Sequence, residues 1–372
     1  MFEIIHTSKK SNARVGRIHT PHGIIDTPNF VAVGTNGTLK SLENKLVNEI
    51  GLQLMFCNTY HMMLQPGTEV VKKAGGLHKF IGRDLPIITD SGGFQVFSLA
   101  YGGVADELKS RGTKKTDGSV LKITEDGVLF RSYRDGSKVL LTPETSVQAQ
   151  KDLGADIIIP FDELPPYHIC PKKLKASLDR THRWEERSLN EHLRNKNDQM
   201  MYAVVHGGVD QNNRQKSIDF LTNLAFDGFA VGGSLGKTKS EMFELLEFTF
   251  PRLPKEKPNH LLGIGDLASL KTCLPYGVDT FDSSYPTRAA RHGVVFTKQG
   301  NVKLTKASLS TQFRPIEEDC SCPTCSHYSI AYLHHLFKAK ELTSMTLASI
   351  HNLHFMVELM KDYRQKILNN EI

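Results

Sequence analysis

Three cysteines near the C-terminal end of the chain have the spacing of metal ligands. Cys320, Cys322 and Cys325 lie within six residues, whereas the other three cysteines stand alone. Three thiolates this close repel one another unless a cation lies between them, and structural zinc takes four ligands in a tetrahedron. We therefore expect one structural Zn²⁺, closed by a fourth protein ligand. Three reduced thiols without a metal are the alternative.

The fourth ligand is expected to be a histidine that follows the cysteines. His327 is too close to the cluster to close a loop comfortably. His334 and His335 lie in a segment with helical character, while His351 lies beside a turn-like break before the last helix. His354 is a further candidate. Spacing alone leaves His351 and the pair His334 and His335 as equal alternatives.

Three aspartates follow short apolar runs from separate parts of the chain, so each carboxylate emerges from an expected strand. The runs and their aspartates are Leu85–Thr89 with Asp90, Asp156–Phe161 with Asp162, and Val278–Phe281 with Asp282. Carboxylates placed in this way can act as general acids, general bases or nucleophiles. An Asx turn or a helix cap is the structural alternative for Asp90 and Asp162.

Small residues and a histidine accompany these carboxylates. The first aspartate is followed by Ser91, Gly92, Gly93 and Phe94. Glycines let backbone N–H groups approach a ligand closely, and a phenylalanine ring offers a flat apolar surface. His206 lies in VVHGGV, where the two glycines again favour a ligand over a histidine of the core.

The segment around the third aspartate contains a second carboxylate and several basic residues. Asp279 and Asp282 fall on opposite faces of one strand because successive side chains alternate. Asp282 lies nearer the strand end and is the better catalytic candidate. The basic residues that follow are Arg288, Arg291, His292, Lys298, Lys303 and Lys306. Basic residues in such a run most often belong to a solvated loop, but beside an active site they would bind phosphates.

Bringing the strand ends together requires a particular sheet. The eight apolar runs are Asn29–Val33, Leu52–Cys57, Leu85–Thr89, Asp156–Phe161, Met201–Val205, Phe229–Val231, His260–Gly263 and Val278–Phe281. Continuous apolar strands that alternate with helices favour a parallel sheet, and eight such units favour a closed (β/α)₈ TIM barrel. Catalytic groups of such barrels lie at the C-terminal strand ends. A doubly wound open sheet is the alternative.

Two segments interrupt the alternation and suggest how the chain is divided. Residues 101–141 are rich in Gly, Lys and Asp and predict a β-hairpin insertion into a barrel of residues 1–292. Residues 293–351 contain the cysteine cluster and predict a zinc-binding subdomain. Residues 352–372 have helical spacing and predict a closing helix that packs back on the barrel.

Composition excludes some classes of protein. The 372 residues are 39% hydrophobic and 23% charged, so a sizeable core is possible and wholesale disorder is not expected. The net charge of +6 permits a polyanionic partner without establishing one. The N-terminal residues contain no apolar core of the length that predicts a signal peptide, and no apolar run approaches membrane-spanning length, so we expect a cytoplasmic protein.

Taken in order, the motifs resemble those of the tRNA-guanine transglycosylases. They are TDSGGFQV, FDE, VHGG, FAVGGS, LLGIG, FDSSYPTRAARHG and CSCPTC with His351, and they cover nearly the whole chain. The resemblance implies a (β/α)₈ barrel with a zinc subdomain, and it selects His351 as the fourth ligand. It also implies a homodimer of the bacterial or eukaryotic type that modifies the tRNA anticodon.

The resemblance assigns a role to each carboxylate. Asp282 corresponds to the nucleophile that attacks the ribose of the wobble guanosine in tRNAs with GUN anticodons. Asp90 corresponds to the general acid and base of the exchange, in which a free 7-deazaguanine base replaces guanine. Asp162 would accept hydrogen bonds from the base, and Gly233 N–H and His206 would address its carbonyl oxygen.

The resemblance also assigns the surroundings of the base and of the RNA. Phe94 and Leu262 would sandwich the base, and the remaining residues of the pocket are Ser91, Gly92, Gly93, Ser234, Leu235 and Gly236. The residues that correspond to tRNA contacts are Gly263, Ile264, Gly265, Asp266, Thr287, Arg288 and Arg291.

Four departures from the family pattern bear on which base is inserted. His206 stands where Gln is usual, Leu164 replaces a small residue after FDE, and Ser234–Leu235 replace Leu-Ala or Leu-Ser. Gly236 stands where members that use 7-aminomethyl-7-deazaguanine carry Val, which favours the bulkier queuine. The alternatives are the same reaction with 7-aminomethyl-7-deazaguanine, a non-catalytic tRNA-binding accessory subunit, and a barrel enzyme with catalytic zinc.

Overall fold

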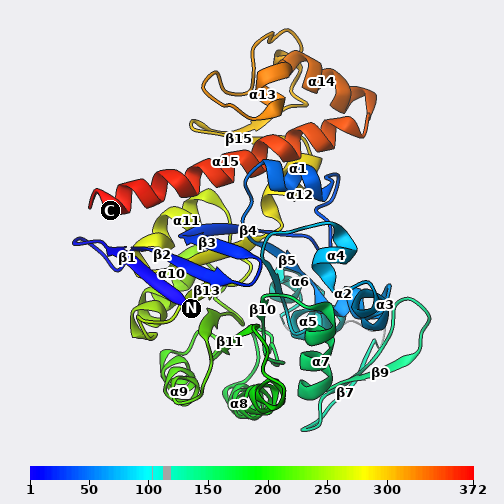
Figure 1. Ribbon diagram of the computed structural model, residues 1–372, viewed down its shortest axis with the longest axis vertical. Coiled ribbons are helices and arrows are strands. Elements are labelled where there is room, and N and C mark those ends of the chain that lie inside the picture. The colour runs from blue at the N-terminus through cyan, green and yellow to red at the C-terminus, as the bar shows by residue number, and fades with distance from the viewer. Residues whose placement is uncertain (103, 112–118) are drawn as a thin grey trace.

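The computed structural model describes residues 1–102, 104–111 and 119–372, and its centre is a closed barrel of eight parallel strands (Figure 1). The strands are β4 (Asn29–Val33), β5 (Met55–Cys57), β6 (Ile87–Thr89), β10 (Ile157–Ile158), β11 (Met200–Val205), β12 (Gly228–Val231), β13 (Asn259–Leu261) and β14 (Thr280–Ser283). β14 pairs with β4 in parallel and closes the ring. Each strand overlaps one of the eight predicted runs. The predicted TIM barrel is therefore confirmed, and the open sheet is excluded.

Helices lie around the barrel between the strands. They are α1 (Asn44–Glu49), α2 (Thr59–Leu64), α3 (Thr68–Lys73), α4 (Leu77–Ile81), α7 (Pro143–Leu153), α8 (Pro171–Arg194), α9 (Gln211–Thr222), α10 (Lys239–Thr249), α11 (Leu267–Cys273) and α12 (Tyr285–Arg291). Local sequence signals set their ends. Thr142 caps α7 through Thr145 N–H, Pro143 occupies its first turn, and Gly154 ends it in a left-handed conformation.

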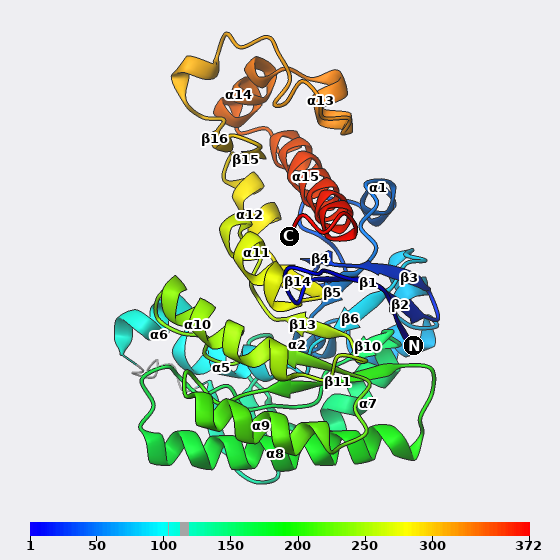
Figure 2. The same ribbon diagram turned by 90° about the vertical axis from the view of Figure 1, so that its left-hand side faces the viewer.

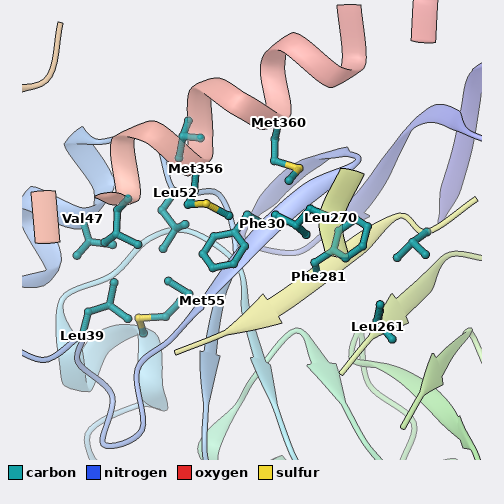
Figure 3. Close-up of a cluster of buried hydrophobic side chains, with 14 of the residues drawn as sticks. Phe30, Leu39, Val47, Leu52, Met55, Leu261, Leu270, Phe281, Met356 and Met360 are labelled. Carbon is teal, nitrogen blue, oxygen red and sulfur yellow. The ribbon is translucent and has the colours of Figure 1, made fainter. Parts of the chain in front are cut away.

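Strand alternation separates the barrel interior from the layer between strands and helices. Figure 3 shows Phe30 and Phe281 among apolar side chains that also include Met356 and Met360 of the last helix. Burial of one such ring stabilises the fold by about 1.5–3 kcal/mol. Because Phe281 points outward, its neighbours in β14 point into the barrel. The last of these neighbours is the predicted nucleophile.

An N-terminal sheet that the sequence analysis did not predict packs against one end of the barrel. It is antiparallel and consists of β1 (Phe2–Thr7), β2 (Arg14–Thr20) and β3 (Gly23–Thr27). Ile18 and Ile25 are fully buried and pack with the apolar residues of the barrel interior. Arg14 pairs with Asp279, which precedes β14, so the sheet covers the N-terminal ends of the strands.

The insertion between β6 and α7 has more elements than the predicted hairpin. It contains α5 (Gly93–Tyr101), α6 (Val104–Ser110), and a three-stranded antiparallel sheet of β7 (Val120–Ile123), β8 (Val128–Arg131) and β9 (Lys138–Leu141). Phe130 and Leu141 pack with Phe161 and Trp184, which ties the sheet to the barrel and to α8. Part of the predicted segment, residues 103 and 112–118, lies outside the described residues.

The C-terminal part projects from the barrel and then returns to it (Figure 2). It consists of the hairpin β15 (Val294–Thr297) and β16 (Gly300–Lys303), α13 (Pro323–His327), α14 (Ile330–Ala339) and the long α15 (Thr343–Leu368). Short 3₁₀ helices are η1 (Phe250–Arg252), η2 (Leu274–Tyr276) and η3 (Ala307–Leu309). α15 packs beside α12. Among the described residues, no helix is long and apolar enough to cross a membrane.

The last helix begins earlier than the sequence analysis predicted. The sequence predicts a turn-like break beside His351 and a closing helix after it, but α15 is continuous from Thr343. Leu347, Ile350 and Leu353 are buried at spacings of three, so the apolar face extends through the predicted break. His351 is thus held on a rigid helix instead of a loop.

Candidate active site

Asp90 lies directly after β6 and accepts hydrogen bonds from neutral donors. Oδ2 accepts from Asn58 Nδ2 at 2.7 Å and from Gln95 Nε2 at 2.8 Å, and Oδ1 accepts from Thr59 N–H at 2.8 Å. Desolvation raises the pKa of Asp90 to about 6, although these three hydrogen bonds lower it, and the charge of Asp162 raises it further. A carboxyl group with this pKa can both give and take a proton near neutral pH.

Asp162 is held by two side chains from other elements. Ser91 Oγ donates to Oδ1 at 2.7 Å, and Nε2 of His206 lies 2.8 Å from Oδ2. A Cβ at Gly93 would lie 2.5 Å from the Asp162 carbonyl oxygen, so only glycine fits at this position. The structure therefore brings the FDE, SGG and VHGG motifs together at one carboxylate.

The imidazole of His206 lies between Asp162 and the loop after β12. A Cβ at Gly233 would lie 2.7 Å from Nδ1 of His206, and φ at Gly233 is +79°. Because Nε2 lies against Asp162, Nδ1, which is buried, is the ring nitrogen left without a partner among the described residues.

Asp282 lies in β14 and is 6% exposed. Its Oδ1 accepts from Gly263 N–H at 2.8 Å and lies 3.0 Å from Nε2 of His260. Gly263 has φ of +75°, a conformation that suits glycine and turns its N–H towards the carboxylate. Leu262, next to it, packs against the barrel core.

A buried arginine connects the loops that follow β11 and β12. Arg214, on α9, donates to the carbonyl oxygens of Val205, Gly208 and Ser234 at 2.5, 2.9 and 3.1 Å. Burial lowers its pKa to about 9. Because one guanidinium bonds both loops, it sets the spacing between the VHGG and GGS segments.

A hollow lies beside Asp162 on the side of the insertion. It is small, with a volume of about 60 Å³, and is lined mainly by apolar residues, among them Phe97, Tyr101 and Leu164. Phe94 lies at the start of α5 and is 47% exposed. An exposed ring of this kind is available to stack on a planar ligand.

The residues predicted to contact RNA are not equally accessible. Asp266 caps α11 by accepting from Ser269 N–H, and it also pairs with Lys239 at 2.6 Å. Thr287 is buried, whereas Arg288 is exposed. A Cβ at Gly265 would lie 2.4 Å from Cβ of Ser283, so Gly265 is required by packing. Ile264 packs against the core, and Arg291 is half-buried.

The cysteine cluster and His351 form a compact centre. Nδ1 of His351 lies 3.3, 3.6 and 3.7 Å from the Sγ atoms of Cys325, Cys322 and Cys320. Nε2 of His351 lies 2.7 Å from the Phe296 carbonyl oxygen, so the ring proton is on Nε2 and the lone pair of Nδ1 faces the sulfurs. Three thiols and one imidazole nitrogen suit a tetrahedral metal ion.

The other histidine candidates lie less favourably. Nδ1 of His334 bonds the Leu304 carbonyl oxygen at 2.8 Å, and Nδ1 of His354 approaches only Cys320, at 3.8 Å. Hydrogen bonds from Cys322 and Cys325 hold the pKa of the Cys320 thiol below its usual value. A thiolate is the form that binds metals.

Comparison with known proteins places the chain in a family. A family model described as queuine tRNA-ribosyltransferase matches residues 8–372. The chain is 72% identical over 366 residues to the queuine tRNA-ribosyltransferase of Protochlamydia amoebophila (strain UWE25), which covers 98% of this chain and 95% of that protein. It is 55% identical over 372 residues to the protein of the same name from Chlamydia felis (strain Fe/C-56), which covers 100% and 99%. The chain belongs to the queuine tRNA-ribosyltransferase family.

Four residues that bond the candidate aspartates, or the loops around them, were not singled out from the sequence. They are Asn58, Gln95, Arg214 and His260. Asn58 directly follows β5, so the strand-end argument that selected the aspartates applies equally to it. Gln95 and Arg214 lie on helices, and His260 lies inside a strand, so no comparable signal marks them.

Proposed function

We propose that this tRNA-guanine transglycosylase exchanges the wobble guanine of tRNAs with GUN anticodons for a 7-deazaguanine base. The observation that carries the proposal is that Asp90 and Asp282, both at the C-terminal ends of barrel strands, have different hydrogen-bond partners. Asp90 has neutral hydrogen-bond donors and a pKa raised to about 6. Asp282 has both its bonds on Oδ1. The first arrangement suits an acid and base, and the second leaves one oxygen for attack.

Asp282 is the nucleophile of this proposal. Its carboxylate forms a bond to the anomeric carbon of the ribose, and the bond from that carbon to guanine N9 breaks. Asp90 gives a proton to the departing guanine. The incoming base then loses a proton to Asp90 and displaces the carboxylate, so two inversions retain the configuration.

The base occupies the space between the loops. A guanine-like edge donates its ring N–H and its amine to Asp162, while Gly233 N–H addresses the carbonyl oxygen. His206 shares Asp162 with the base in this proposal. Phe94 and Leu262 cover the two faces of the ring, and Ser91, Gly92, Gly93, Ser234 and Leu235 complete the pocket. Because the base must leave its stack, the anticodon loop opens on binding.

The tRNA lies across the mouth beside β13 and β14. Gly263, Ile264, Gly265 and Asp266 form the loop after β13, and Thr287, Arg288 and Arg291 lie on α12. Exposed Arg288 is suited to a phosphate contact, whereas buried Thr287 supports α12. Such an enzyme acts where tRNA is present, which is the cytoplasm.

Queuine is the inserted base of this proposal. Gly236 has φ of +123°, and a Cβ there would lie 3.1 Å from Cγ of Glu241 and from the backbone nitrogen of Met242. The backbone thus requires glycine, and Glu241 and Met242 border the space that a side chain would fill. The proposal of queuine therefore rests on the resemblance at Gly236. In Gly236→Val, backbone strain and a change in base specificity could not be told apart. The test therefore measures incorporation of each base by the wild-type enzyme. Efficient incorporation of 7-aminomethyl-7-deazaguanine without queuine would contradict the assignment.

The ion at the cysteine centre is proposed to be structural zinc. Cys320, Cys322, Cys325 and His351 would hold it, and four protein ligands leave no position for a substrate. Removal of the metal should then loosen the segment from β15 to α14. Metal content measured by atomic absorption, before and after chelation, tests this assignment.

A homodimer is proposed from exposed rings of the same region. Tyr328 and Tyr332 stack at 5.4 Å between centroids, and Tyr332 stacks with His335 at 6.4 Å. Tyr328 and Tyr332 are 38% and 42% exposed. Aromatic side chains are enriched in interfaces, so the Tyr332→Ala variant should shift sedimentation towards the monomer.

The decisive test of the proposed reaction is capture of a covalent RNA–protein adduct. Wild-type enzyme incubated with tRNA and then denatured should retain the tRNA on the protein. Asp282→Ala should retain none, while its melting temperature stays close to that of the wild type. Retention by Asp282→Ala would assign the nucleophile elsewhere.

A further inference from the structure

His260 lies beneath the proposed nucleophile inside the barrel and is fully buried. Its Nε2 lies 3.0 Å from Oδ1 of Asp282, and its Nδ1 lies 2.8 Å from Oγ1 of Thr280. Thr280 and Asp282 face the interior from the same strand, two residues apart. The imidazole therefore bridges two consecutive inward positions of β14.

The hydrogen bonds of Thr280 and His260 allow two arrangements of the protons on the imidazole ring. Thr280 has one hydroxyl hydrogen and two neighbours, Nδ1 of His260 and the Asn259 carbonyl oxygen at 3.1 Å. If the hydroxyl donates to Nδ1, the neutral ring carries its proton on Nε2. If it donates to Asn259, Nδ1 carries a proton and an ionised Asp282 still requires one on Nε2. With Asp282 ionised, both arrangements place an N–H against Oδ1.

The two oxygens of Asp282 are therefore unequal. Oδ1 accepts from Gly263 N–H and from His260, whereas the described part of the chain gives Oδ2 no hydrogen bond. Hydrogen-bond donors withdraw electron density from the oxygen that they contact and fix the plane of the carboxylate. Oδ2 is the oxygen left free to form a bond.

We propose that His260 is a positioning residue that holds Oδ1, makes Oδ2 the attacking atom, and stabilises the carboxylate when it departs. This inference rests on the proposed covalent reaction. In the first displacement, Oδ2 forms the ester bond to the anomeric carbon, and the electron pair of the glycosidic bond leaves with guanine. In the second, the C–Oδ2 bond breaks, its electron pair returns to the carboxylate, and the charge spreads to Oδ1, where both donors point.

The consequence is an unequal effect of His260 on the two displacements. The N–H stabilises a charge that is lost when the ester forms and regained when it breaks. Loss of the donor should therefore slow ester breakdown more than ester formation. A residue that merely filled the core would change stability and leave the ratio of the two rates unchanged.

The test compares three variants with the wild-type enzyme. His260→Phe keeps an aromatic ring without the donor, and His260→Gln restores an amide N–H. His78→Phe is the matched control, because His78 is also a buried imidazole on a carboxylate, 3.1 Å from Asp156, but at the opposite end of the barrel. Labelled guanine release reports the first displacement, and adduct decay after addition of free base reports the second.

The Phe variant should lose about tenfold to a hundredfold in turnover, the size expected for one hydrogen bond to a charged group. Its KM for the base should stay within about threefold, and adduct should accumulate in the steady state. His260→Gln should recover most of the turnover. His78→Phe should lose stability but keep the wild-type turnover and ratio of rates.

Several outcomes would overturn the inference. These are a wild-type ratio of rates in His260→Phe, or a Gln variant as slow as the Phe variant. If His260→Phe does not fold, His260→Leu replaces it, since it also removes the donor to Oδ1, and an unchanged ratio there overturns the inference equally. Failure of the wild-type enzyme to form any adduct would instead reject the proposed covalent reaction itself.

Discussion

The two ends of the barrel use the same residue type in opposite ways. Asp156, at the N-terminal end, accepts from Ile87 N–H at 2.8 Å and lies 2.8 and 3.1 Å from nitrogens of His22 and His78. These partners outweigh desolvation and hold the pKa of Asp156 below its ordinary value. Asp90, at the C-terminal end, has three neutral donors, and there desolvation prevails and raises the pKa to about 6.

Hydrogen-bond partners decide the direction of the pKa shift at Asp156, whereas burial decides it at Asp90 and also raises the pKa of Asp279, although Arg14 opposes that shift. The second carboxylate at the N-terminal end, Asp279, receives a bidentate bond from Arg14 and a backbone bond from Asn259, so both its oxygens are occupied. At the mouth, Asp282 keeps Oδ2 free of hydrogen bonds from the described residues. We therefore expect substitutions at the two ends to separate activity from stability.

The largest expected effect is at Asp282. Asp282→Ala should lower guanine exchange by at least about a thousandfold, because no other group would form the ester. Its melting temperature should remain near that of the wild type, since only one carboxylate with a free oxygen is lost. Incorporation of labelled guanine into tRNA and thermal unfolding measure the two quantities. Parallel loss of activity and stability would remove the distinction between the barrel ends.

The next effect is at Asp90. Asp90→Asn should slow exchange by about a hundredfold to ten-thousandfold through loss of acid and base catalysis. Because the pKa is raised to about 6, ionisation of Asp90 opposes folding above that pH, and the Asn variant should melt at a higher temperature at pH 7.5.

The pH dependence of guanine release by the wild-type enzyme tests the role of Asp90 in a second way. Departure of guanine requires protonated Asp90, so the first displacement should slow as pH rises through about 6. The measurement is guanine release in a single turnover from pH 5 to pH 8 (roughly the span around this pKa). Asp90→Asn should lack this limb, and a limb that persists in the variant would assign it to another group.

At the opposite end, Arg14→Ala should destabilise the protein without changing its chemistry. Arg14 is 7% exposed and pairs with fully buried Asp279, and breaking such a pair costs about 3–5 kcal/mol. Arg17 is the matched control in the same strand, because its pair with Asp26 is 47% and 36% exposed. Arg17→Ala should cost about 0–1 kcal/mol. Urea unfolding gives both free energies, and equal values would contradict the comparison.

The smallest effect concerns acid stability. The pKa of Asp156 is lowered, so its contribution is present above its unfolded-state pKa and is lost as pH falls through the lower folded-state value. Between roughly pH 4 and pH 2, the wild type should lose more free energy of unfolding than Asp156→Asn. Identical slopes in this window would show that the partners of Asp156 do not favour its ionised form.

The sequence predicted the barrel strands well because their apolar runs are continuous and buried on both faces. It missed the N-terminal sheet, where most residues of Phe2–Thr7 are exposed and the apolar pattern is weaker. It also placed a break at His351, although α15 continues through that residue. The helix was missed there because Ser344, Ser349 and Asn352 interrupt the apolar spacing, and tertiary burial overrides their low helix propensity.

The sequence by itself indicated the candidate residues of the site: three aspartates at strand ends, glycine pairs in three of the loops, and three thiols in six residues. Only the tertiary structure decided the state of each group. Asp282 meets His260 and Asp162 meets His206 because parallel strands place residues far apart in the chain side by side. A hydrogen-bond partner and a desolvated pKa depend on three-dimensional neighbours, and strand periodicity does not encode them.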